Sequence, residues 1–333
     1  MAESPSRRIK VLSIIHHRFS LWHAPEWLKP RLEREFPQLQ IELHDNYADV
    51  ESRISDAEIF LGWSLRGDQV KAARKLRWIH STAAAVHQLM SPELIASDIV
   101  VTNARSVHGP VVAEHAMALM FAAAKRLNAC SRYQQERHWA QDEIWEMRPQ
   151  EIAGSTVAVI GLGSIGSPLA QHARALGMHV IAVREHSRRD PGPAHEVFGP
   201  LELDLVLSRS DFVILAVPVT PRTEHLMTRQ RLARMQRHAV LINVARGSLI
   251  EESALLDALR NQNIGGAALD VFEDEPLPPD SEFWRLPNVI ITPHTAGLTD
   301  KMWERQYELL ADNLRRYLAG QQLCNVVDKR SGY

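Results

Sequence analysis

Residues 156–166 read Thr-Val-Ala-Val-Ile-Gly-Leu-Gly-Ser-Ile-Gly. The first five residues form a short apolar run of the kind found in parallel strands that are buried on both faces. Three glycines follow with the spacing G-x-G-x-x-G, at the start of a helical pattern over residues 165–176. In such a unit the first glycine permits a tight turn and the second lets the backbone approach a pyrophosphate. The third lets the helix pack closely on the strand.

A helix that begins at this loop presents unpaired N–H groups and partial positive charge to a phosphate. Gly161, Gly163 and Gly166 are therefore predicted to bind a dinucleotide. The alternative is a glycine turn that serves only packing. A lone glycine motif is weak evidence, but its setting between a strand and a helix favours dinucleotide binding.

Further apolar runs alternate with helical patterns on both sides of this motif. The alternation predicts an α/β protein with doubly wound parallel sheets. A loop-like stretch at residues 103–110 leads into an almost wholly apolar helical pattern at 110–124 and divides two series of strands. We expect strands at residues 10–15, 41–43, 59–61, 78–80 and 99–102, and then at 156–160, 179–183, 212–216, 239–243, 267–269 and 289–292. Further helices are expected at residues 228–235, 253–261 and 301–318.

The composition is that of an ordinary globular protein with two domains. The chain has 333 residues, and 38 basic and 40 acidic side chains give a net charge of −2. This near-balance argues against a protein that holds nucleic acid by bulk charge. Two cysteines, Cys130 and Cys324, exclude a disulfide framework and a four-cysteine zinc site. No stretch approaches the ~18 apolar residues of a membrane span, and no secretory signal is recognisable, so a cytoplasmic protein is expected.

The residues after the second strand of the glycine motif bear on the choice of dinucleotide. NAD-binding proteins usually carry Asp or Glu at this strand tip, where it accepts a hydrogen bond from the ribose 2′-hydroxyl. Here the tip is Arg184, followed by Glu185, His186, Ser187, Arg188 and Arg189. Arginines suit a 2′-phosphate, and Glu185 is offset by one residue. We therefore expect NADP(H) to be preferred over NAD(H), with Arg184, Ser187 and Arg188 as contacts; a solvated basic loop is the alternative.

Polar residues follow three strands of the second series. Residues 241–247 contain Arg246, residues 268–276 contain Asp270 and Glu275, and residues 290–297 contain His294. Ligands of open α/β sheets bind beyond the carboxyl ends of the strands. We therefore expect these four side chains to converge on one crevice with the glycine loop, although each taken singly is more often a surface or packed residue.

In this order and spacing, the motifs resemble the D-isomer-specific 2-hydroxyacid dehydrogenase family. The resemblance is greatest to its glyoxylate/hydroxypyruvate reductase branch, down to the terminal Val-Asp-Lys-Arg-Ser-Gly-Tyr, and it covers nearly the whole chain. It implies a flavodoxin-like substrate domain of residues 1–102 and 298–333, and a Rossmann-type dinucleotide-binding domain of residues 103–297. It also implies a homodimer built largely on the long helix after Asn103.

The resemblance implies a role for each polar residue. Arg246 matches the arginine that holds the substrate carboxylate and polarises the keto oxygen, and a planar guanidinium suits both tasks. His294 matches the general acid/base and Glu275 its carboxylate partner, whereas Glu273 is the weaker candidate. The hydride comes from the nicotinamide, so neither a metal ion nor a protein nucleophile is expected.

Further contacts are implied by position. The backbone amides of Ala84 and Ala85 are expected to bind the substrate carboxylate, in a loop that is glycine-rich in the family. A positive φ in this loop would strain the alanines. Trp63 is expected either to line the substrate pocket or to pack in the core. The remaining expected cofactor contacts are Ser164, Ile165, Val217, Pro218, Thr223, Val244, Ala245, Asp270 and His294.

The sequence thus predicts an NADPH-preferring reductase of small 2-keto acids that forms D-2-hydroxy acids. Another D-2-hydroxyacid dehydrogenase, such as phosphoglycerate dehydrogenase, is the enzymatic alternative, although it often carries an appended regulatory domain. Formate dehydrogenase is disfavoured, because Glu275 stands where that branch has an uncharged amide. A dinucleotide-sensing protein like the C-terminal-binding-protein corepressors, which share the fold, is the non-enzymatic alternative.

Overall fold

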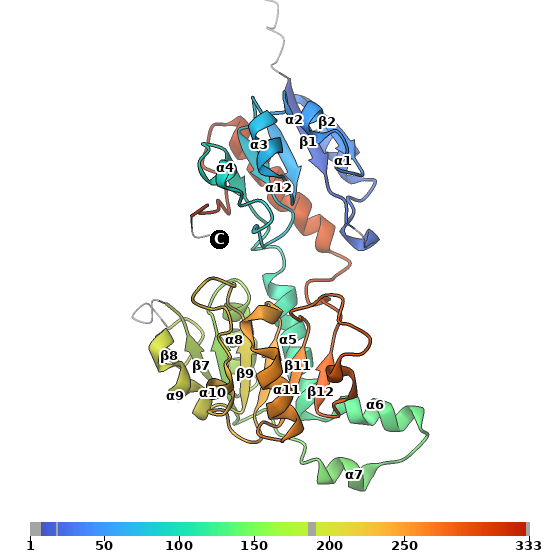
Figure 1. Cartoon of the computed structure of the whole chain (residues 1–333), viewed down its shortest axis with the longest axis vertical. Coiled ribbons are helices and arrows are strands. Elements are labelled where there is room, and N and C mark those ends of the chain that lie inside the picture. The colour runs from blue at the N-terminus through green and yellow to red at the C-terminus, as the bar shows by residue number, and fades with distance from the viewer. Residues whose placement is uncertain (1–7, 18, 186–190, 331–333) are drawn as a thin grey trace, which may run out of the picture. The chain divides into compact units, whose positions relative to one another are not determined.

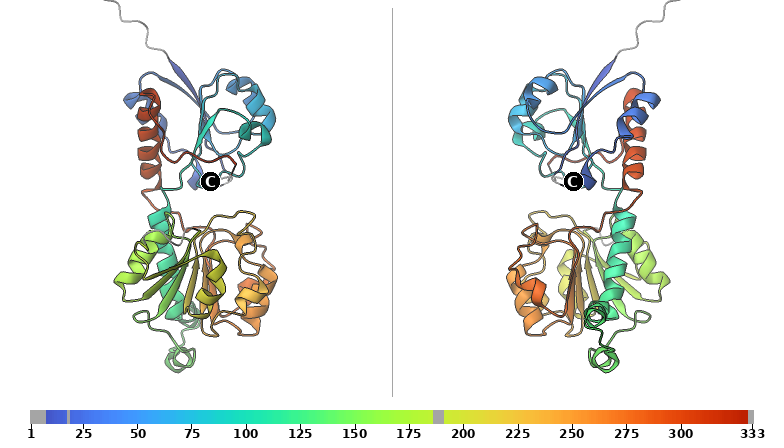
Figure 2. Two further views of the ribbon diagram at one scale, coloured as in Figure 1. Left: turned by 90° about the vertical axis from the view of Figure 1, so that its left-hand side faces the viewer. Right: turned by 90° about the vertical axis from the view of Figure 1, so that its right-hand side faces the viewer.

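The computed structural model describes residues 8–17, 19–185 and 191–330. The chain forms two compact units (Figure 1). Unit 1 consists of Met1–His108 and Thr299–Tyr333, and unit 2 consists of Gly109–Leu298. Each contains one sheet in which every described strand pair is parallel, and helices cover both faces (Figure 2). The predicted doubly wound α/β fold is confirmed.

The boundary between the units lies a few residues later than the expected division at residue 103. The backbone N–H of Asn103 donates to the carbonyl oxygen of Asn325, and that of Ala104 donates to the carbonyl oxygen of Ala83. These bonds tie the segment after β5 (Val100–Thr102) to unit 1, which continues to His108.

Unit 1 has a five-stranded sheet in the order β2-β1-β3-β4-β5. Successive residues of a strand face opposite sides of the sheet. Leu12 and Phe60 accordingly lie in one core with helices α2 and α4, whereas Val11 and Ile59 lie in a second core with α1 and α12. The strands are β1 (Ile9–Ile14), β2 (Leu39–His44), β3 (Ile59–Gly62), β4 (Trp78–His80) and β5 (Val100–Thr102). The helices are α1 (Leu28–Glu35), α2 (Val50–Ile54), α3 (Gly67–Ala72), α4 (Pro92–Ile95) and α12 (Met302–Leu318), with a 3-10 turn at Ser20–Trp22.

The C-terminal segment completes unit 1. Leu310 and Leu314 of α12 are buried in the same core as Trp78, and the ring of Trp78 stacks on Tyr317 at 5.3 Å between centroids. After α12 the chain runs back along β5, where the N–H of Val327 donates to the carbonyl oxygen of Val101. Residues on both sides of unit 2 in the sequence therefore build one hydrophobic core.

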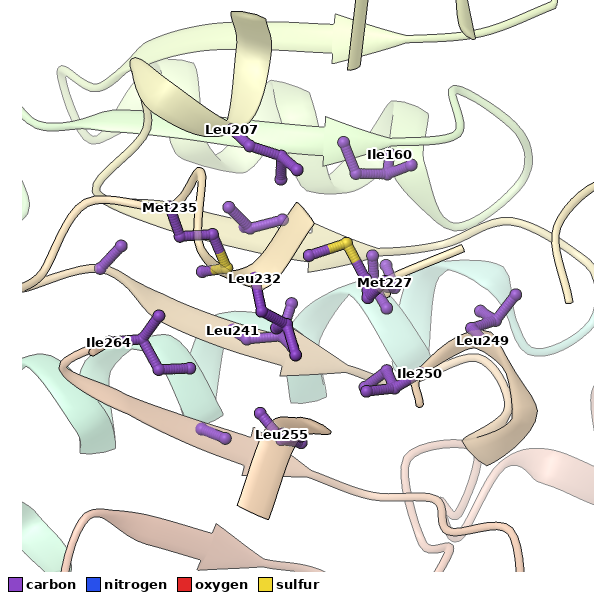
Figure 3. Close-up of a cluster of buried hydrophobic side chains, with 14 of the residues drawn as sticks. Ile160, Leu207, Met227, Leu232, Met235, Leu241, Leu249, Ile250, Leu255 and Ile264 are labelled. Atoms are coloured by element: carbon purple, nitrogen blue, oxygen red, sulfur yellow. The ribbon is translucent and has the colours of Figure 1, made fainter. Parts of the chain in front are cut away.

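Unit 2 has a seven-stranded sheet in the order β12-β11-β10-β9-β6-β7-β8. One face is covered by α5 and α8, and the other by α9, α10 and α11 (Figure 2). Figure 3 shows part of the second core, in which Leu232 and Leu255 lie against Leu241 of strand β10. The strands are β6 (Thr156–Ile160), β7 (His179–Val183), β8 (Glu196–Phe198), β9 (Phe212–Leu215), β10 (Val240–Asn243), β11 (Gly266–Leu269) and β12 (Val289–Ile291). The helices are α5 (Gly109–Ala124), α6 (Leu127–Gln135), α7 (Gln141–Glu146), α8 (Gly166–Ala175), α9 (Leu203–Ser208), α10 (Arg229–Leu232) and α11 (Glu252–Arg260), with 3-10 turns at Pro200–Glu202, Gly247–Leu249 and Glu282–Arg285.

Several elements of unit 2 differ from the expectation, which named no helix at α6, α7 or α9. One further unpredicted element is β8, an edge strand of three half-buried residues that has no apolar run. The helix expected at residues 228–235 shortens to α10, with Thr228 as its N-cap. No helix within the described ranges combines the length and apolarity that crossing a bilayer requires.

His80 is a fully buried histidine at the end of β4. Its Nδ1 lies 2.8 Å from the hydroxyl oxygen of Thr102. Burial lowers the pKa of His80 from 6.5 to about 4. The folded state therefore keeps this ring neutral, whereas the unfolded chain binds a proton at the same position below pH ~6.5.

Unit 1 is therefore expected to lose stability as the pH falls from about 6.5 towards 4. The lowered pKa of one buried histidine corresponds to roughly 3 kcal/mol of unfolding free energy over this window. His80→Gln should flatten this pH dependence in urea unfolding measured between pH 7.5 and 4, whatever its effect on stability at pH 7.5. His172→Gln, at an exposed position of α8, is the control and should retain it. An unchanged pH dependence in His80→Gln would contradict the prediction.

Candidate active site

The glycine loop joins β6 to α8 in unit 2. Gly161 has a φ of +103°, and a Cβ there would lie 2.7 Å from the carbonyl oxygen of Ala216, so this position requires glycine. A Cβ on Gly166 would collide with the carbonyl oxygen of Gly161. Beside Gly163, by contrast, a Cβ would meet nothing within 4 Å. Open space at a helix N-terminus, flanked by the exposed Ser164 and half-buried Ile165, fits a pyrophosphate.

The tip of β7 carries the residues expected to distinguish the two dinucleotides. Arg184 is half-buried, and its backbone N–H donates to the carbonyl oxygen of Phe198 in β8. Glu185 accepts a hydrogen bond from Arg222, with 2.9 Å between Nη1 and Oε1. Sequence reasoning missed Arg222, because it lies far along the chain, in the loop after β9. Two further expected contacts, Ser187 and Arg188, lie outside the described residues.

The remaining expected cofactor residues of unit 2 lie in the loops after β9 and β10. The hydroxyl of Thr223 donates to the carbonyl oxygen of Pro218 at 2.7 Å, which closes the loop that begins at Val217. Val244 and Ala245 follow β10 and are buried, at 5% and 8% exposure. These two residues can therefore present only a small part of their surface to a ligand.

His294 and Glu275 form a hydrogen-bonded pair, with 2.6 Å between Nδ1 and Oε2. Because an ionised carboxylate only accepts hydrogen bonds, Nδ1 carries the proton and Nε2 is the nitrogen left for a ligand. Burial disfavours the charged form of Glu275, but the bond from His294, the N–H of Phe272 and the charge of Arg246 outweigh it and lower its pKa. Both side chains of the pair remain partly exposed, at 45% and 31%.

Arg246 follows β10 in a turn held by Asn243. The side-chain amide of Asn243 donates to the carbonyl oxygen of Arg246 at 2.8 Å, and its oxygen accepts from the N–H of Ala245 at 3.1 Å. Burial lowers the pKa of Arg246, and the nearby carboxylate of Glu275 opposes this effect. An arginine remains protonated even so. A half-buried cation thus lies within electrostatic reach of the His294–Glu275 pair.

Asp270 is buried, at 1% exposure, immediately after β11. Its Oδ1 accepts from the hydroxyl of Thr292 at 2.5 Å and from the N–H of Thr295 at 2.9 Å, and its Oδ2 accepts from the N–H of Ala296 at 2.9 Å. Its backbone carbonyl accepts from the N–H of His294 at 2.9 Å. Asp270 therefore braces the turn that carries His294, and its direct contact with a cofactor remains a prediction.

The turn itself is strained at His294. This residue has a φ of +54°, a left-handed conformation that costs a residue other than glycine about 1–2 kcal/mol. Strain of this kind persists where the surrounding contacts overdetermine the backbone, as the bonds from Asp270 do here.

In unit 1, the loop after β4 carries the amides expected to bind a carboxylate. Ala84 is exposed and Ala85 half-buried, and none of the alanines from Ala83 to Ala85 has a positive φ. The strain considered for alanine in this loop is therefore absent. The side-chain amide of Asn103 donates to the carbonyl oxygen of Ala84 at 2.7 Å and so fixes the loop.

Trp63 follows β3 and is half-buried among other aromatic rings of unit 1. Its indole N–H donates to the carbonyl oxygen of His16, and its ring has edge-to-face contacts with His17 and Trp22 at 5.7 and 6.3 Å. These contacts hold Trp63 in place at the carboxyl edge of the sheet, where it keeps part of its surface exposed. Among the side chains that the structure describes, no group of three or more His, Cys, Asp or Glu is arranged to hold a metal ion.

Comparison with known proteins identifies the family. Residues 117–296 match the model of the "D-isomer specific 2-hydroxyacid dehydrogenase, NAD binding domain". A glyoxylate reductase of Korarchaeum cryptofilum is 34% identical over 281 residues, which are 82% of this chain and 80% of that protein. A D-3-phosphoglycerate dehydrogenase of Methanocaldococcus jannaschii is 33% identical over 83% of this chain, but over 52% of its own length.

A solved structure extends the likeness to nearly the whole fold. The NADPH-dependent glyoxylate/hydroxypyruvate reductase of Sinorhizobium meliloti, in complex with NADP and sulfate, superposes with a TM-score of 0.82. It is 27% identical and covers 98% of this chain and 100% of its own. Together with the glycine loop and the His294–Glu275 pair, these matches show that the chain belongs to the D-isomer-specific 2-hydroxyacid dehydrogenase family and is an NAD(P)-dependent oxidoreductase.

Proposed function

We propose that the protein reduces small 2-keto acids of the glyoxylate or hydroxypyruvate type to D-2-hydroxy acids and prefers NADPH. The observation that carries the proposal is the bond between His294 Nδ1 and Glu275 Oε2, which leaves an imidazole nitrogen free to exchange a proton. Glyoxylate reductases among the relatives support this choice of substrate.

Each side chain has a distinct task in this reaction. The loop of Gly161, Gly163 and Gly166 would hold the dinucleotide, which when bound would supply the hydride for the keto carbon. His294 donates the proton from Nε2 to the keto oxygen, and the imidazole is left neutral. Glu275 keeps the proton on Nδ1 and stabilises the charged ring before transfer. Arg246 holds the substrate carboxylate and draws charge onto the keto oxygen, which favours hydride attack. In unit 1, carboxylate binding is the task proposed for the amides of Ala84 and Ala85.

The preference for NADPH rests on the positive charge at the tip of β7. Arg184 starts the basic stretch that includes Ser187 and Arg188, and a planar guanidinium matches a 2′-phosphate. The carboxylate of Glu185, at the tip of β7, is engaged by Arg222. That ion pair reduces the repulsion between Glu185 and a phosphate.

We also propose that the protein is a homodimer that uses α5 and the arm formed by α6 and α7. The arm stands away from the sheet of unit 2 (Figure 1). It exposes large apolar side chains: Leu127 at 51%, Trp139 at 89% and Trp145 at 71%. Tryptophans as exposed as these are typical of surfaces that a partner covers.

A second D-2-hydroxyacid dehydrogenase activity, on 3-phosphohydroxypyruvate, is the alternative favoured by the M. jannaschii relative. Initial rates with glyoxylate, hydroxypyruvate, 2-ketobutyrate, phenylpyruvate and 3-phosphohydroxypyruvate, each with NADPH and with NADH, test the proposal. Turnover of 3-phosphohydroxypyruvate alone would favour the alternative. Cofactor binding without turnover of any keto acid would favour a dinucleotide-sensing protein.

Glu275→Gln should lower kcat/KM for the preferred keto acid by about 10²–10⁴-fold, because the amide no longer stabilises the protonated ring. Glu273→Gln is the matched control: this neighbour pairs instead with His225, at 3.2 Å, and its change should leave kcat/KM within about twofold. Equal losses in the two variants would contradict the assignment of Glu275. Steady-state kinetics measure both.

Arg184→Ala should raise the KM for NADPH by about tenfold and leave the KM for NADH nearly unchanged, because only NADPH carries the 2′-phosphate. Arg174→Ala, at an exposed arginine near the end of α8, should change neither value. A parallel rise for both cofactors in Arg184→Ala would show a structural role without phosphate recognition.

The double variant Trp139→Ser/Trp145→Ser should dissociate the proposed dimer. Light scattering is expected to give twice the 37.7 kDa of one chain for the unchanged protein, and 37.7 kDa for the variant. Trp284→Ser, which removes an indole that is 51% exposed outside the arm, should remain dimeric. A monomeric unchanged protein would disprove the dimer.

A further inference from the structure

Helix α5 is almost wholly apolar, and His115 is a half-buried titratable group within it. Its Nε2 lies 3.0 Å from the hydroxyl oxygen of Thr292 and 3.5 Å from Oδ1 of Asp270. No task proposed above uses His115. Sequence reasoning passed over it, although a histidine in an apolar helix was the available signal.

The direction of the hydrogen bonds from His115 follows from the chemistry of the groups. The hydroxyl of Thr292 has one proton, which it donates to Oδ1 of Asp270 at 2.5 Å. Thr292 must therefore accept from His115, so that Nε2 of His115 carries a proton. The series of hydrogen bonds thus runs from His115, which donates to Thr292, to the carboxylate of Asp270, which accepts from Thr292.

This series of hydrogen bonds ends at Asp270, which holds the strained turn around His294. Asp270 holds Thr292, Thr295 and Ala296 through its carboxylate and His294 through its carbonyl oxygen. His294 lies between the bonded residues, with a φ of +54°. A hydroxyl that accepts one hydrogen bond becomes a better donor in the next. Loss of the bond from His115 thus weakens the clamp on one side of His294.

We propose that His115 is a positioning residue that holds the general acid His294 in place through Thr292 and Asp270. It lies on α5 and acts through Thr292 and Asp270. The inference rests on the role proposed for His294, and its signature is a lower rate of the chemical step with unchanged substrate binding. Displacement of a catalytic group by a fraction of an ångström is enough to slow such a step.

The kinetic test compares variants of the full-length protein with glyoxylate, or with whichever keto acid it turns over best. His115→Ala should lower kcat roughly tenfold and change KM less than twofold. His115→Gln, whose amide N–H reaches a similar position, should restore most of the rate. His172→Ala, at an exposed histidine of α8, should have no effect.

A double-variant cycle tests whether His115 acts through Thr292. Thr292→Val removes the hydroxyl and keeps the shape of the side chain. The kcat of His115→Ala/Thr292→Val should be no lower than that of Thr292→Val alone, because loss of the Thr292 hydroxyl already interrupts the series of hydrogen bonds. Multiplicative losses, or a His115→Ala variant that behaves like His172→Ala, would overturn the inference.

A measurement that needs no turnover separates this inference from the proposed function. In NMR spectra of ¹⁵N-histidine-labelled protein, His115→Ala should shift or broaden the ring signals of His294, and His172→Ala should leave them unchanged. If the unchanged protein reduces no keto acid, the proposed function fails, and the spectra still decide the role of His115. Unaltered His294 signals in His115→Ala would overturn it.

Discussion

The carboxylate of Asp270 is the interaction on which the geometry of unit 2 most depends. It is excluded from water and satisfied by a hydroxyl and two backbone N–H groups. A buried carboxylate is stable only when it is hydrogen-bonded in this way, so the groups around it have little freedom to move. The consequence is a fixed turn at the end of β12, in which His294 is held in a backbone conformation that it would not adopt alone.

The brace also joins two neighbouring strands. β10 and β11 pair in parallel, and the backbone N–H of Asp270 donates to the carbonyl oxygen of Asn243. Asn243 in turn holds the turn that carries Arg246. A backbone hydrogen bond between Asp270 and Asn243 therefore links two turns at one sheet edge, and the side chain of each residue holds its own turn. Parallel strands place their carboxyl ends at the same edge, which explains how residues far apart in sequence come within electrostatic reach.

Local patterns in the sequence were enough to predict most of the strands and several of the helices. Apolar runs marked the buried strands, and the spacing of Gly161, Gly163 and Gly166 marked the loop before α8. Strand β8 was not predicted, because its three residues are only half-buried and its sequence therefore contains no apolar run. The pairing of Glu275 with His294 obeys no local rule of periodicity and was expected through family resemblance alone. The contact of His115 with Thr292 joins residues 177 positions apart, so that only the folded chain reveals it.

The two-part construction of unit 1 has a consequence for the order of folding during synthesis. Unit 2 is one continuous stretch, so it can fold once Leu298 has left the ribosome. Unit 1 begins earlier in the chain but lacks α12 until later, and only α1 covers the sheet face that contains Trp78 in the meantime. The domain that is started first is therefore finished last. Part of this apolar face therefore stays exposed in the nascent chain after unit 2 is complete, and such transiently exposed surface is prone to aggregation.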